Sequence, residues 1–256
     1  MDIIKTQNII KNYQNTNVLN GIDLTIQKGE FIGIMGKSGS GKTTLVKILG
    51  MIEPKTDGML CYNNMDVENI SEKEAARIRR EELGFIFQEF FLVESLNILE
   101  NVMLPLLISC QSIRRGLPMA VPGGKNVRID GKEKARVLMK QFGIEVLENK
   151  MPYELSGGER QRTAICRALI HDPQIIFADE PTGNLDSKSG KIVIDALQTI
   201  HLKLGKTVIM VTHDPQMASY CDRIILLKDG MILGQLERRT DTNDFYKKII
   251  ERMIEL

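Results

Sequence analysis

The stretch Gly36-Lys37-Ser38-Gly39-Ser40-Gly41-Lys42-Thr43 decides the fold of this chain. It follows the apolar run Phe31 to Met35, which has the pattern of a strand, and it leads into a helix-like segment from about Thr43 to Leu49 that stops at Gly50. Glycines let the backbone curl so that several N–H groups point at one anion, and the helix start adds its positive dipole end. This order of strand, glycine-rich turn and helix predicts a loop that binds phosphate groups.

The residue types of this loop suit a nucleotide with its metal ion. We expect Lys42 to bridge the β- and γ-phosphates and the Thr43 hydroxyl to hold Mg²⁺. The other residues of the predicted ATP site are the rest of the loop and the residue that follows it: Gly36, Ser38, Gly39, Ser40, Gly41 and Thr44. A Gly/Ser turn that binds nothing is the alternative, and the flanking strand and helix count against it.

Length and composition fit one large domain with a lobe inserted in it. The chain has 256 residues, a mass of 28.9 kDa and a hydrophobic fraction of 43%, which is enough to fill a core. A formal charge of +1 with mixed acids and bases argues against a nucleic-acid partner. The cysteines lie dozens of residues apart in no metal-type pair, so we expect reduced thiols at Cys61, Cys110, Cys166 and Cys221.

Neither a signal peptide nor a membrane span is predicted. Met1 to Lys5 lack the apolar core and cleavage site of a leader, and the most apolar stretch, Val102 to Ile108, is short and contains Pro105. A helix needs roughly 18 to 20 apolar residues to cross a bilayer. If the protein serves a membrane process, another chain must supply the membrane part.

The N-terminal third predicts a small sheet followed by helices. Asp2 to Tyr13 and Val18 to Ile26 alternate apolar and polar residues, which indicates an antiparallel β layer. After the phosphate loop and its helix, Ser71 and Glu74 have the spacing of a capping box. We expect that second helix to end at Gly84.

Residues 89–170 are mostly helical in pattern and are interpreted as a lobe inserted between two strands of the nucleotide core. Within it, residues 110–130 combine glycines and prolines with basic residues, which predicts a flexible basic loop. A solvated connector is the first interpretation of this loop. Contact with a partner protein or with acidic lipid headgroups is the alternative.

The C-terminal half predicts a buried parallel sheet and a final helix. Uniformly apolar runs are typical of strands covered on both faces, and three occur here: Ile175 to Ala178, Val208 to Val211 and Ile224 to Leu227. Within residues 240–256, Phe245, Ile249 and Met253 share one helical face. Since the flanks carry both charge signs, we expect a packing helix and not a membrane anchor.

Acidic, imidazole and amide side chains stand at the ends of the predicted strands. Ligands bind beyond the carboxyl ends of parallel strands, so Asp179 and Glu180 should lie beside the phosphate loop. We expect Asp179 to hold Mg²⁺ and Glu180 to deprotonate the attacking water. His213 closes the run from Val208 and is expected to contact the γ-phosphate. Gln88 ends the run Phe85 to Phe87 and is expected to touch the metal shell and the attacking water.

The segment Leu155-Ser156-Gly157-Gly158-Glu159-Arg160-Gln161-Arg162 predicts a second anion site. Ser156 and Glu159 form a capping box at a helix start, and Gly157 and Gly158 expose its first N–H groups. One γ-phosphate does not need two complete anion-binding sites from the same subunit. We therefore expect a head-to-tail homodimer, in which this segment of each copy caps the ATP bound to the other.

The strings GKSGSGKTT, LSGGERQR, IIFADEPTGNLD and VTHD, with Gln88 between the first two, resemble the nucleotide-binding subunit of an ABC transporter. The resemblance implies an α/β fold with a P-loop NTPase core, a mainly parallel sheet, an N-terminal antiparallel β subdomain and an inserted α-helical subdomain, all in one nucleotide-binding domain over residues 1–256. It implies that Tyr13 stacks on adenine and that Asp186 communicates across the dimer. It further implies that Leu99 to Leu107 help to line a groove for an integral membrane permease.

Within that family, FIFQEFFLVESL and VIMVTHDPQMASYCDRIILLKDG look closest to bacitracin-type peptide-resistance transporters, near macrolide exporters and lipoprotein releasers. The loop at 110–130 is longer than usual for the family, and Glu159 replaces a common glutamine. The resemblance implies an ATPase on the inner face of the cell membrane, and it leaves open a sensor histidine kinase reached through the permease. Alternatives are a lipoprotein-release, macrolide-export or cell-division ATPase, a non-transport ABC protein, or a mechanical regulator of cell-wall enzymes.

Overall fold

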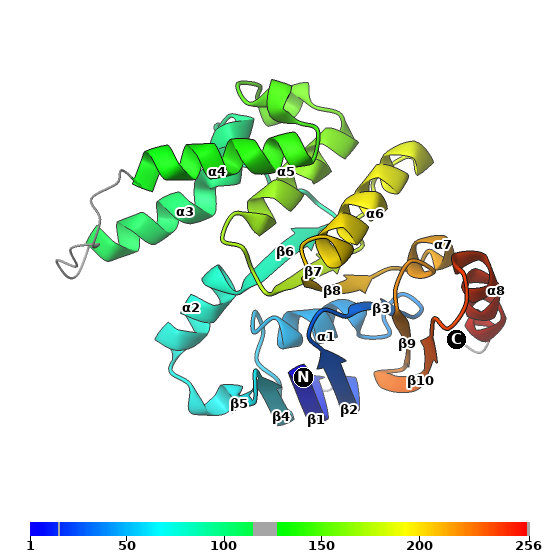
Figure 1. Cartoon of the computed structure of the whole chain (residues 1–256). Helices are drawn as coiled ribbons and strands as arrows, with labels where there is room; N and C mark the ends of the chain where they lie inside the picture. Colours follow the sequence, from blue (N-terminus) through cyan, green and yellow to red (C-terminus); the bar gives the residue numbers. More distant parts are fainter. Residues whose placement is uncertain (15, 115–126, 255–256) are drawn as a thin grey trace.

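The computed structural model describes residues 1–14, 16–114 and 127–254, apart from the side chains of residues 109–114 and 127–130. In this part of the chain the strands form two sheets, and a group of helices stands over one edge of the larger sheet (Figure 1). The larger sheet has the strand order β10-β9-β3-β8-β7-β6 and the smaller one β2-β1-β4-β5. The predicted α/β fold class is therefore confirmed.

The larger sheet is parallel except at one edge. Its strands are β3 (Phe31–Met35), β6 (Leu83–Phe87), β7 (Ile175–Asp179), β8 (Thr207–Val211) and β9 (Arg223–Lys228), with β10 (Met231–Glu237) antiparallel to β9. Every residue of β3 and β8 is buried. This burial on both faces explains why the strands have no alternating pattern in the sequence.

Successive side chains of each central strand enter two different cores. Ile32 and Ile34 of β3 pack with α1 (Lys42–Leu49) and the smaller sheet, whereas Phe31 and Met35 pack on the side of the helical lobe. Because side chains alternate along a strand, one short strand serves both cores. Helix α1 is consequently enclosed between the two sheets and holds the phosphate loop against the molecule's centre.

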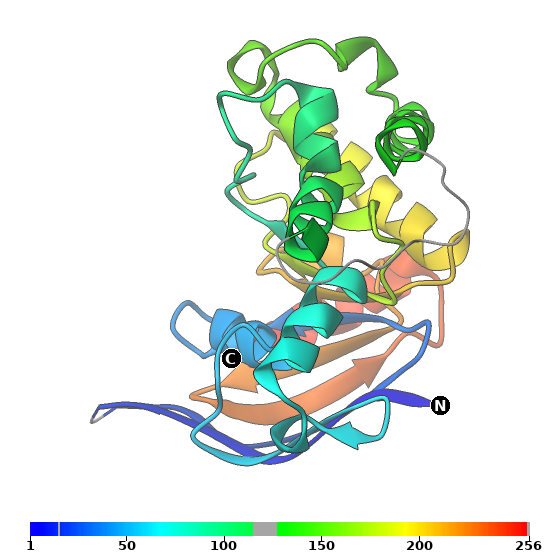
Figure 2. The same ribbon diagram turned by 90° about the vertical axis from the view of Figure 1, so that its left-hand side faces the viewer.

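The smaller sheet is antiparallel, as predicted. It is formed by β1 (Asp2–Tyr13), β2 (Thr16–Gln27), β4 (Asp57–Tyr62) and β5 (Met65–Asp66). In Figure 2 it lies at the bottom of the molecule, with the green helices at the top. A short 3-10 helix, η1 (Val67–Asn69), and helix α2 (Glu72–Glu81) lead from it back to the larger sheet.

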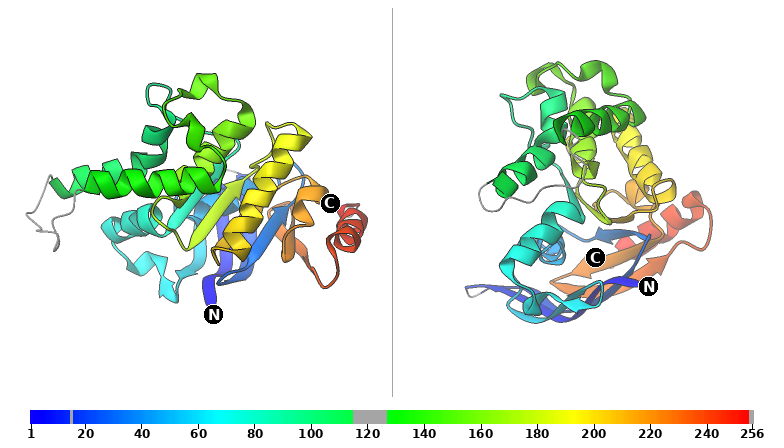
Figure 3. Two further views of the ribbon diagram at one scale, coloured as in Figure 1. Left: turned by 45° about the horizontal axis from the view of Figure 1, so that its top comes forward. Right: turned by 60° about the vertical axis from the view of Figure 1, so that its left-hand side comes forward.

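The helical lobe occupies the chain between β6 and β7. It contains α3 (Ile98–Arg114), α4 (Val127–Gln141), η2 (Glu145–Leu147), η3 (Pro152–Glu154) and α5 (Gly157–Leu169), and both views of Figure 3 show it at the top of the molecule. Both ends of the loop predicted over 110–130 are instead helical, since α3 extends to Arg114 and α4 begins at Val127. The first breakers after Cys110 are Gly116 and Pro118, so α3 continues to Arg114. Residues 115–126 lie outside the described part.

The prediction that α2 ends at Gly84 is wrong. Its start is as expected, since Ser71 Oγ accepts from the Glu74 N–H at 3.2 Å, but the helix ends at Glu81 and Gly84 lies inside β6. A Cβ on Gly84 would stand 2.8 Å from the Ala168 carbonyl oxygen of α5. The glycine therefore permits a close approach of α5 to the sheet, which a sequence pattern cannot distinguish from a helix end.

The last helices pack on the same face of the larger sheet as the helical lobe. They are α6 (Ser187–Leu202), α7 (Pro215–Ala218) and α8 (Thr242–Met253), and α8 buries Phe245 and Ile249 as its pattern predicts. Among the cysteines with described side chains, Cys61, Cys166 and Cys221 are free thiols. Within residues 1–14, 16–114 and 127–254, no helix combines the length and the apolar character that a membrane span requires.

We expect Gly84→Ala to lower the free energy of unfolding by about 1–3 kcal/mol, because the added methyl group overpacks the contact of β6 with α5. Urea unfolding followed by circular dichroism measures this. Gly234→Ala in β10 is the matched control, since a Cβ there meets nothing within 4 Å. Equal midpoints for the two variants would contradict the packing explanation.

Candidate functional site

The register of the parallel strands places the predicted site residues at one edge of the sheet. Ile34 of β3 is opposite Val211 of β8, Val211 is opposite Asp179 of β7, and Asp179 is opposite Phe87 of β6. The four strands therefore end almost in one row. The phosphate loop, Glu180, His213 and Gln88 each follow one of these ends, which is where ligands bind in such sheets.

Two glycines of the phosphate loop are required by its backbone. Gly41 is the N-cap of α1 with a φ of 99°, a left-handed conformation that side chains rarely adopt. A Cβ on Gly36 would stand 2.2 Å from the Leu227 carbonyl oxygen of β9. The loop can curl tightly against β9 and turn into α1 only because both positions lack a side chain.

A cavity of about 600 Å³ lies over this loop. The described residues that line it are Val18, Gly36, Ser38, Gly39, Gly41, Lys42, Thr43, Thr44, Glu180 and His213. The structure thus gathers most of the predicted nucleotide site in one place. Sequence reasoning missed Val18, because the approach of β2 to the loop depends on how the two sheets pack and no local motif signals it.

Lys42 is held inside the loop. Its side chain is buried, and Nζ donates hydrogen bonds of 2.8 Å to the carbonyl oxygens of Gly36 and Lys37. Burial lowers the pKa of Lys42, while the charges of Glu180 and Asp179 act in the opposite direction. The cation is therefore fixed at the place where the curled backbone would receive an anion.

Asp179 and Thr43 bring two oxygen donors together beside Lys42. Thr43 Oγ1 donates to Asp179 Oδ1 at 3.3 Å, and burial raises the pKa of the Asp179 carboxyl. The described residues contain no cluster of three or more His, Cys, Asp or Glu side chains that would hold a metal alone. One hydroxyl and one carboxylate fit Mg²⁺, which takes few protein ligands and completes its shell with water and phosphate oxygens.

Glu180 stands in an unusual backbone conformation next to His213. Its φ is +45°, and its N–H donates to the Val211 carbonyl oxygen at 3.0 Å. The carboxylate Oε2 lies 3.2 Å from Nδ1 of His213. Non-glycine residues rarely adopt a positive φ, and such residues cluster at functional sites. The conformation turns the Glu180 side chain into the cavity directly after a strand that ends at Asp179.

Gln88, Ser40 and Tyr13 lie outside the set of residues that line the cavity. Gln88 Nε2 donates to Asn184 Oδ1 at 3.1 Å, so its amide is turned toward the loop after Pro181. Ser40 is buried, and its Oγ has no hydrogen-bond partner among the described residues. Tyr13 ends β1 and donates a hydrogen bond to Glu53.

The second predicted anion site is separate from the first within this chain. Ser156 accepts from the Glu159 N–H at 3.4 Å and Glu159 Oε2 accepts from the Ser156 N–H at 2.8 Å, which is the predicted capping box at the start of α5. Gly157 and Gly158 lie against Leu185 and Ser189 near the start of α6. None of the residues 156–158 is among the described residues that line the phosphate cavity.

Asp186 is the N-cap of α6. It accepts from the N–H groups of Lys188 and Ser189 at 3.0 Å, and from the Ser189 hydroxyl at 2.7 Å. The bonds from Ser189, first its hydroxyl and then its N–H, lower the pKa of Asp186. The Asp186 side chain thus caps α6 within its own chain. Its predicted role in communication across a dimer would be a second role.

A second opening of about 450 Å³ lies between α2, β6, α3 and α5. Apolar residues of this groove include Phe87, Phe91, Leu104, Pro105 and Ile108. Of the segment predicted to line a groove, Leu99, Val102 and Met103 are instead buried in the core of the lobe. A helix shows one face to the groove and the opposite face to the core, so a continuous range cannot line it.

Comparison with known proteins places this α/β nucleotide-binding architecture in a family. Residues 19–183 match the model of the ABC transporter family. The chain is 42% identical over 98% of its length to the bacitracin export ATP-binding protein BceA of Halalkalibacterium halodurans, covering 95% of that protein. It is 39% identical over 93% of its length to the lipoprotein-releasing system ATP-binding protein LolD of Aquifex aeolicus, covering 99% of that protein.

Two further similarities concern a fused protein and a solved dimer. The macrolide export ATP-binding/permease protein MacB of Syntrophobacter fumaroxidans is 40% identical over 91% of this chain, which spans 31% of MacB. The dimeric post-hydrolysis state of the ATP-binding cassette MJ0796 with ADP and Pi has a TM-score of 0.79 and 37% identity, covering 93% of this chain and 99% of that one. The fold and site are those of a nucleotide-hydrolysing cassette. The chain belongs to the ABC transporter family and is an ATPase.

We expect Asp186→Ala to destabilise the protein by about 1 kcal/mol through loss of the α6 cap, and Asp186→Asn to leave stability nearly unchanged because asparagine caps as well. Thermal unfolding of the nucleotide-free protein measures both. Equal losses in the two variants would show that the charge matters for stability, and not the cap.

Proposed function

We propose that this chain powers a membrane permease that confers resistance to antimicrobial peptides of the bacitracin or lantibiotic type. The observation that carries the proposal is the similarity to BceA, because it extends over 98% of this chain at 42% identity. The chain would expel such peptides or free their lipid targets. Its own part in the process is to bind ATP, to close on it and to hydrolyse it.

Binding starts at the phosphate loop. The N–H groups of residues from Gly36 to Gly41 receive the phosphates at the positive end of α1. Lys42 leaves the carbonyl oxygens of Gly36 and Lys37 and donates to the β- and γ-phosphates. Thr43 and Asp179 would hold Mg²⁺, whose charge neutralises the phosphate oxygens in the transition state. Thr44 and the buried Ser40 hydroxyl complete the loop.

Hydrolysis depends on the strand ends beside the loop. Glu180 orients a water molecule and accepts its proton, and its left-handed backbone conformation turns the carboxylate into the cavity for that task. His213, 3.2 Å from that carboxylate, contacts the γ-phosphate. Gln88 would break its hydrogen bond with Asn184 to reach the metal ligands and the attacking water. Because Gln88 directly follows Phe87 of the groove beside β6, this movement would couple nucleotide binding to that groove.

The complete pocket needs two copies of the chain. Ser156, Gly157 and Gly158 are not among the described residues that line the phosphate cavity of their own chain, so in this proposal they cap the nucleotide held by the partner. Tyr13 stacks on the adenine, and Asp186 communicates across the same interface. The similarity to the dimeric MJ0796 cassette supports this arrangement.

The groove between α2, β6, α3 and α5 is proposed as the docking site of the permease. Its apolar residues come from the lobe and from β6, which is directly followed by Gln88. The fusion of ATP-binding and permease parts in MacB supports a permease partner. The chain would then act on the inner face of the cell membrane. A sensor histidine kinase reached through the permease remains a prediction from family resemblance.

A second candidate cargo is a lipoprotein, because LolD is 39% identical over 93% of this chain. Both candidates use the same ATPase chemistry and differ in the permease. A permease with a large extracellular domain between its helices favours peptide resistance. A four-helix permease with a small periplasmic domain favours lipoprotein release or the regulation of cell-wall enzymes.

We expect Glu180→Gln to slow ATP turnover at least about tenfold, since the amide cannot accept the proton from water, while ATP binding persists. Phosphate release assays measure turnover, and size-exclusion chromatography with ATP should show a trapped dimer. Glu237→Gln on β10 is the control, because it removes a carboxylate charge from an ion pair with Arg239, outside the residues that line the phosphate cavity. Unchanged turnover in Glu180→Gln would remove Glu180 from this role.

We expect Phe91→Glu to abolish co-purification of the permease from detergent-solubilised membranes, because its 60% exposed ring lies in the proposed docking groove. Tyr153→Glu is the control, since Tyr153 is 68% exposed on the same lobe but outside the groove. Basal ATP turnover should be equal in both variants. Full retention of the permease by Phe91→Glu would place the docking site elsewhere.

A further inference from the structure

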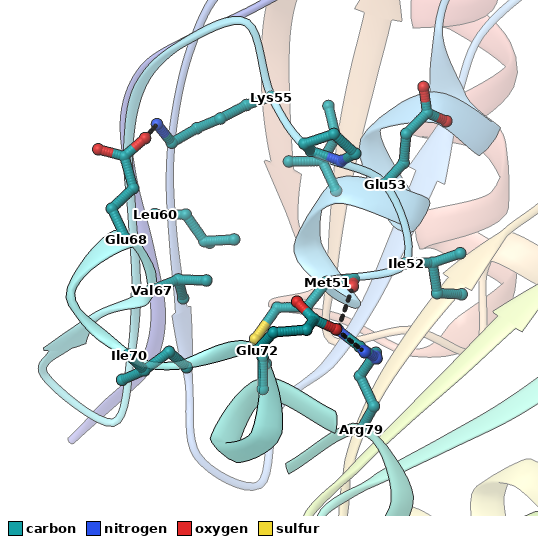
Figure 4. A pocket seen from close by; sticks show the side chains of 13 residues that line it. Met51, Ile52, Glu53, Lys55, Leu60, Val67, Glu68, Ile70, Glu72 and Arg79 are labelled. Carbon is teal, nitrogen blue, oxygen red and sulfur yellow. Dashed lines mark hydrogen bonds and ion pairs between the residues drawn. The ribbon is translucent and has the colours of Figure 1, made fainter. Parts of the chain in front are cut away.

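Glu53 follows the end of α1 and lies on the rim of a third cavity, about 510 Å³ in volume, between α1, α2 and the smaller sheet (Figure 4). Two cationic side chains line this cavity, and each forms an ion pair with a different carboxylate. Lys55 pairs with Glu68, and Arg79 pairs with Glu72 at 2.5 Å. In Figure 4 the Glu53 carboxylate points away from both pairs. It is therefore free to bind groups outside the cavity.

The groups that Glu53 binds belong to the end of β1. The Tyr13 hydroxyl donates a hydrogen bond to Glu53 Oε1, and Lys11 Nζ lies 3.0 Å from the same oxygen. Lys11 Nζ also donates to the Pro54 carbonyl oxygen at 2.7 Å and lies 4.7 Å from the centroid of the Tyr13 ring. The hydroxyl of Tyr13 is thus tethered, and the Lys11 ammonium interacts with its ring.

This tether is partly shielded from solvent. Lys11 is 8% exposed and the Glu53 side chain 21%, so solvent screens their ion pair less than it screens a fully exposed pair. The hydrogen bond from Tyr13, followed by the bond and charge of Lys11, lowers the pKa of Glu53. The carboxylate therefore stays ionised at neutral pH and remains an acceptor for the phenol.

The tethered ring stands beside the phosphate cavity. Tyr13 is 42% exposed, and its hydroxyl interacts with Thr44, which lines that cavity. An exposed side chain without a tether loses rotamer freedom when a ligand orders it, at a cost of about 0.5–1.5 kcal/mol. Here Glu53 and Lys11 order the ring before the nucleotide arrives.

We infer that Glu53, together with Lys11, is a positioning residue for the nucleobase, because it fixes the Tyr13 ring at the edge of the phosphate cavity. The inference rests on the proposed stacking of Tyr13 on adenine. Glu53 would act through Tyr13 alone. It should therefore strengthen the part of the affinity that comes from the base and leave the part that comes from the phosphates unchanged.

The test compares Mg²⁺–ATP with Mg²⁺–tripolyphosphate, which has the phosphates but no base, by titration calorimetry. Glu53→Ala should weaken ATP binding about 2- to 10-fold and leave tripolyphosphate binding unchanged. Glu68→Ala is the matched control, since it also removes a carboxylate from a lysine pair in the same region. A general loss of structure in Glu53→Ala would weaken both ligands equally and would overturn the inference.

Three Tyr13 variants separate positioning from stacking. Tyr13→Phe removes the donor of the hydrogen bond between Tyr13 and Glu53, so it should reproduce the loss of ATP affinity in Glu53→Ala. The double variant of Tyr13→Phe and Glu53→Ala should bind ATP no more weakly than either single variant. Additive losses would show that Glu53 acts independently of the phenol. If Tyr13→Ala weakens ATP binding but Glu53→Ala does not, stacking stands and positioning is wrong. If Tyr13→Ala has no effect on ATP binding, the stacking itself is wrong and the positioning role falls with it.

Discussion

The register of four parallel strands is the constraint on which the rest of the structure depends. Because β3, β8, β7 and β6 end almost in one row, a turn after each strand delivers its side chains to the same edge. The apolar interiors of these strands fix that row, since slipping one strand by one residue would send each of its side chains into the opposite core. Packing in two cores thus sets the geometry of a polar site that neither core contains.

The molecule keeps the two predicted anion sites apart. The phosphate loop is enclosed between two sheets and is held by close backbone contacts at Gly36 and Gly41. The start of α5 lies in the helical lobe, where a capping box between Ser156 and Glu159 shapes it. The lobe is joined to the core through the segments that follow β6 and precede β7. This separation is the reason why the proposed pocket requires a second copy.

Much of this could be predicted from the sequence, and the failures have physical causes. The loop, the strand-end acids and the capping boxes are local patterns of a few residues, and the structure has them in place. The prediction of a helix end at Gly84 is wrong because, in the sequence, a glycine that admits the Ala168 carbonyl looks the same as one that ends a helix. The contribution of Val18 and the burial of Leu99, Val102 and Met103 depend on packing between distant segments. The tether of Tyr13 to Glu53 joins residues 40 positions apart, and no motif contains both.

The hydrogen bonds of Lys42 have a consequence for the end of the catalytic cycle. Its ammonium rests on two carbonyl oxygens of its own loop, and so the cation is satisfied before any ligand arrives. In the role proposed for Lys42, ATP binding would exchange these acceptors for phosphate oxygens, which makes the net gain smaller than for a bare buried charge. When the products depart, the same carbonyl oxygens would accept the ammonium hydrogen bonds again. The carbonyl oxygens of the loop would thus replace the phosphate oxygens as acceptors for Lys42. This replacement favours rapid release of ADP and the return of the subunit to its nucleotide-free state.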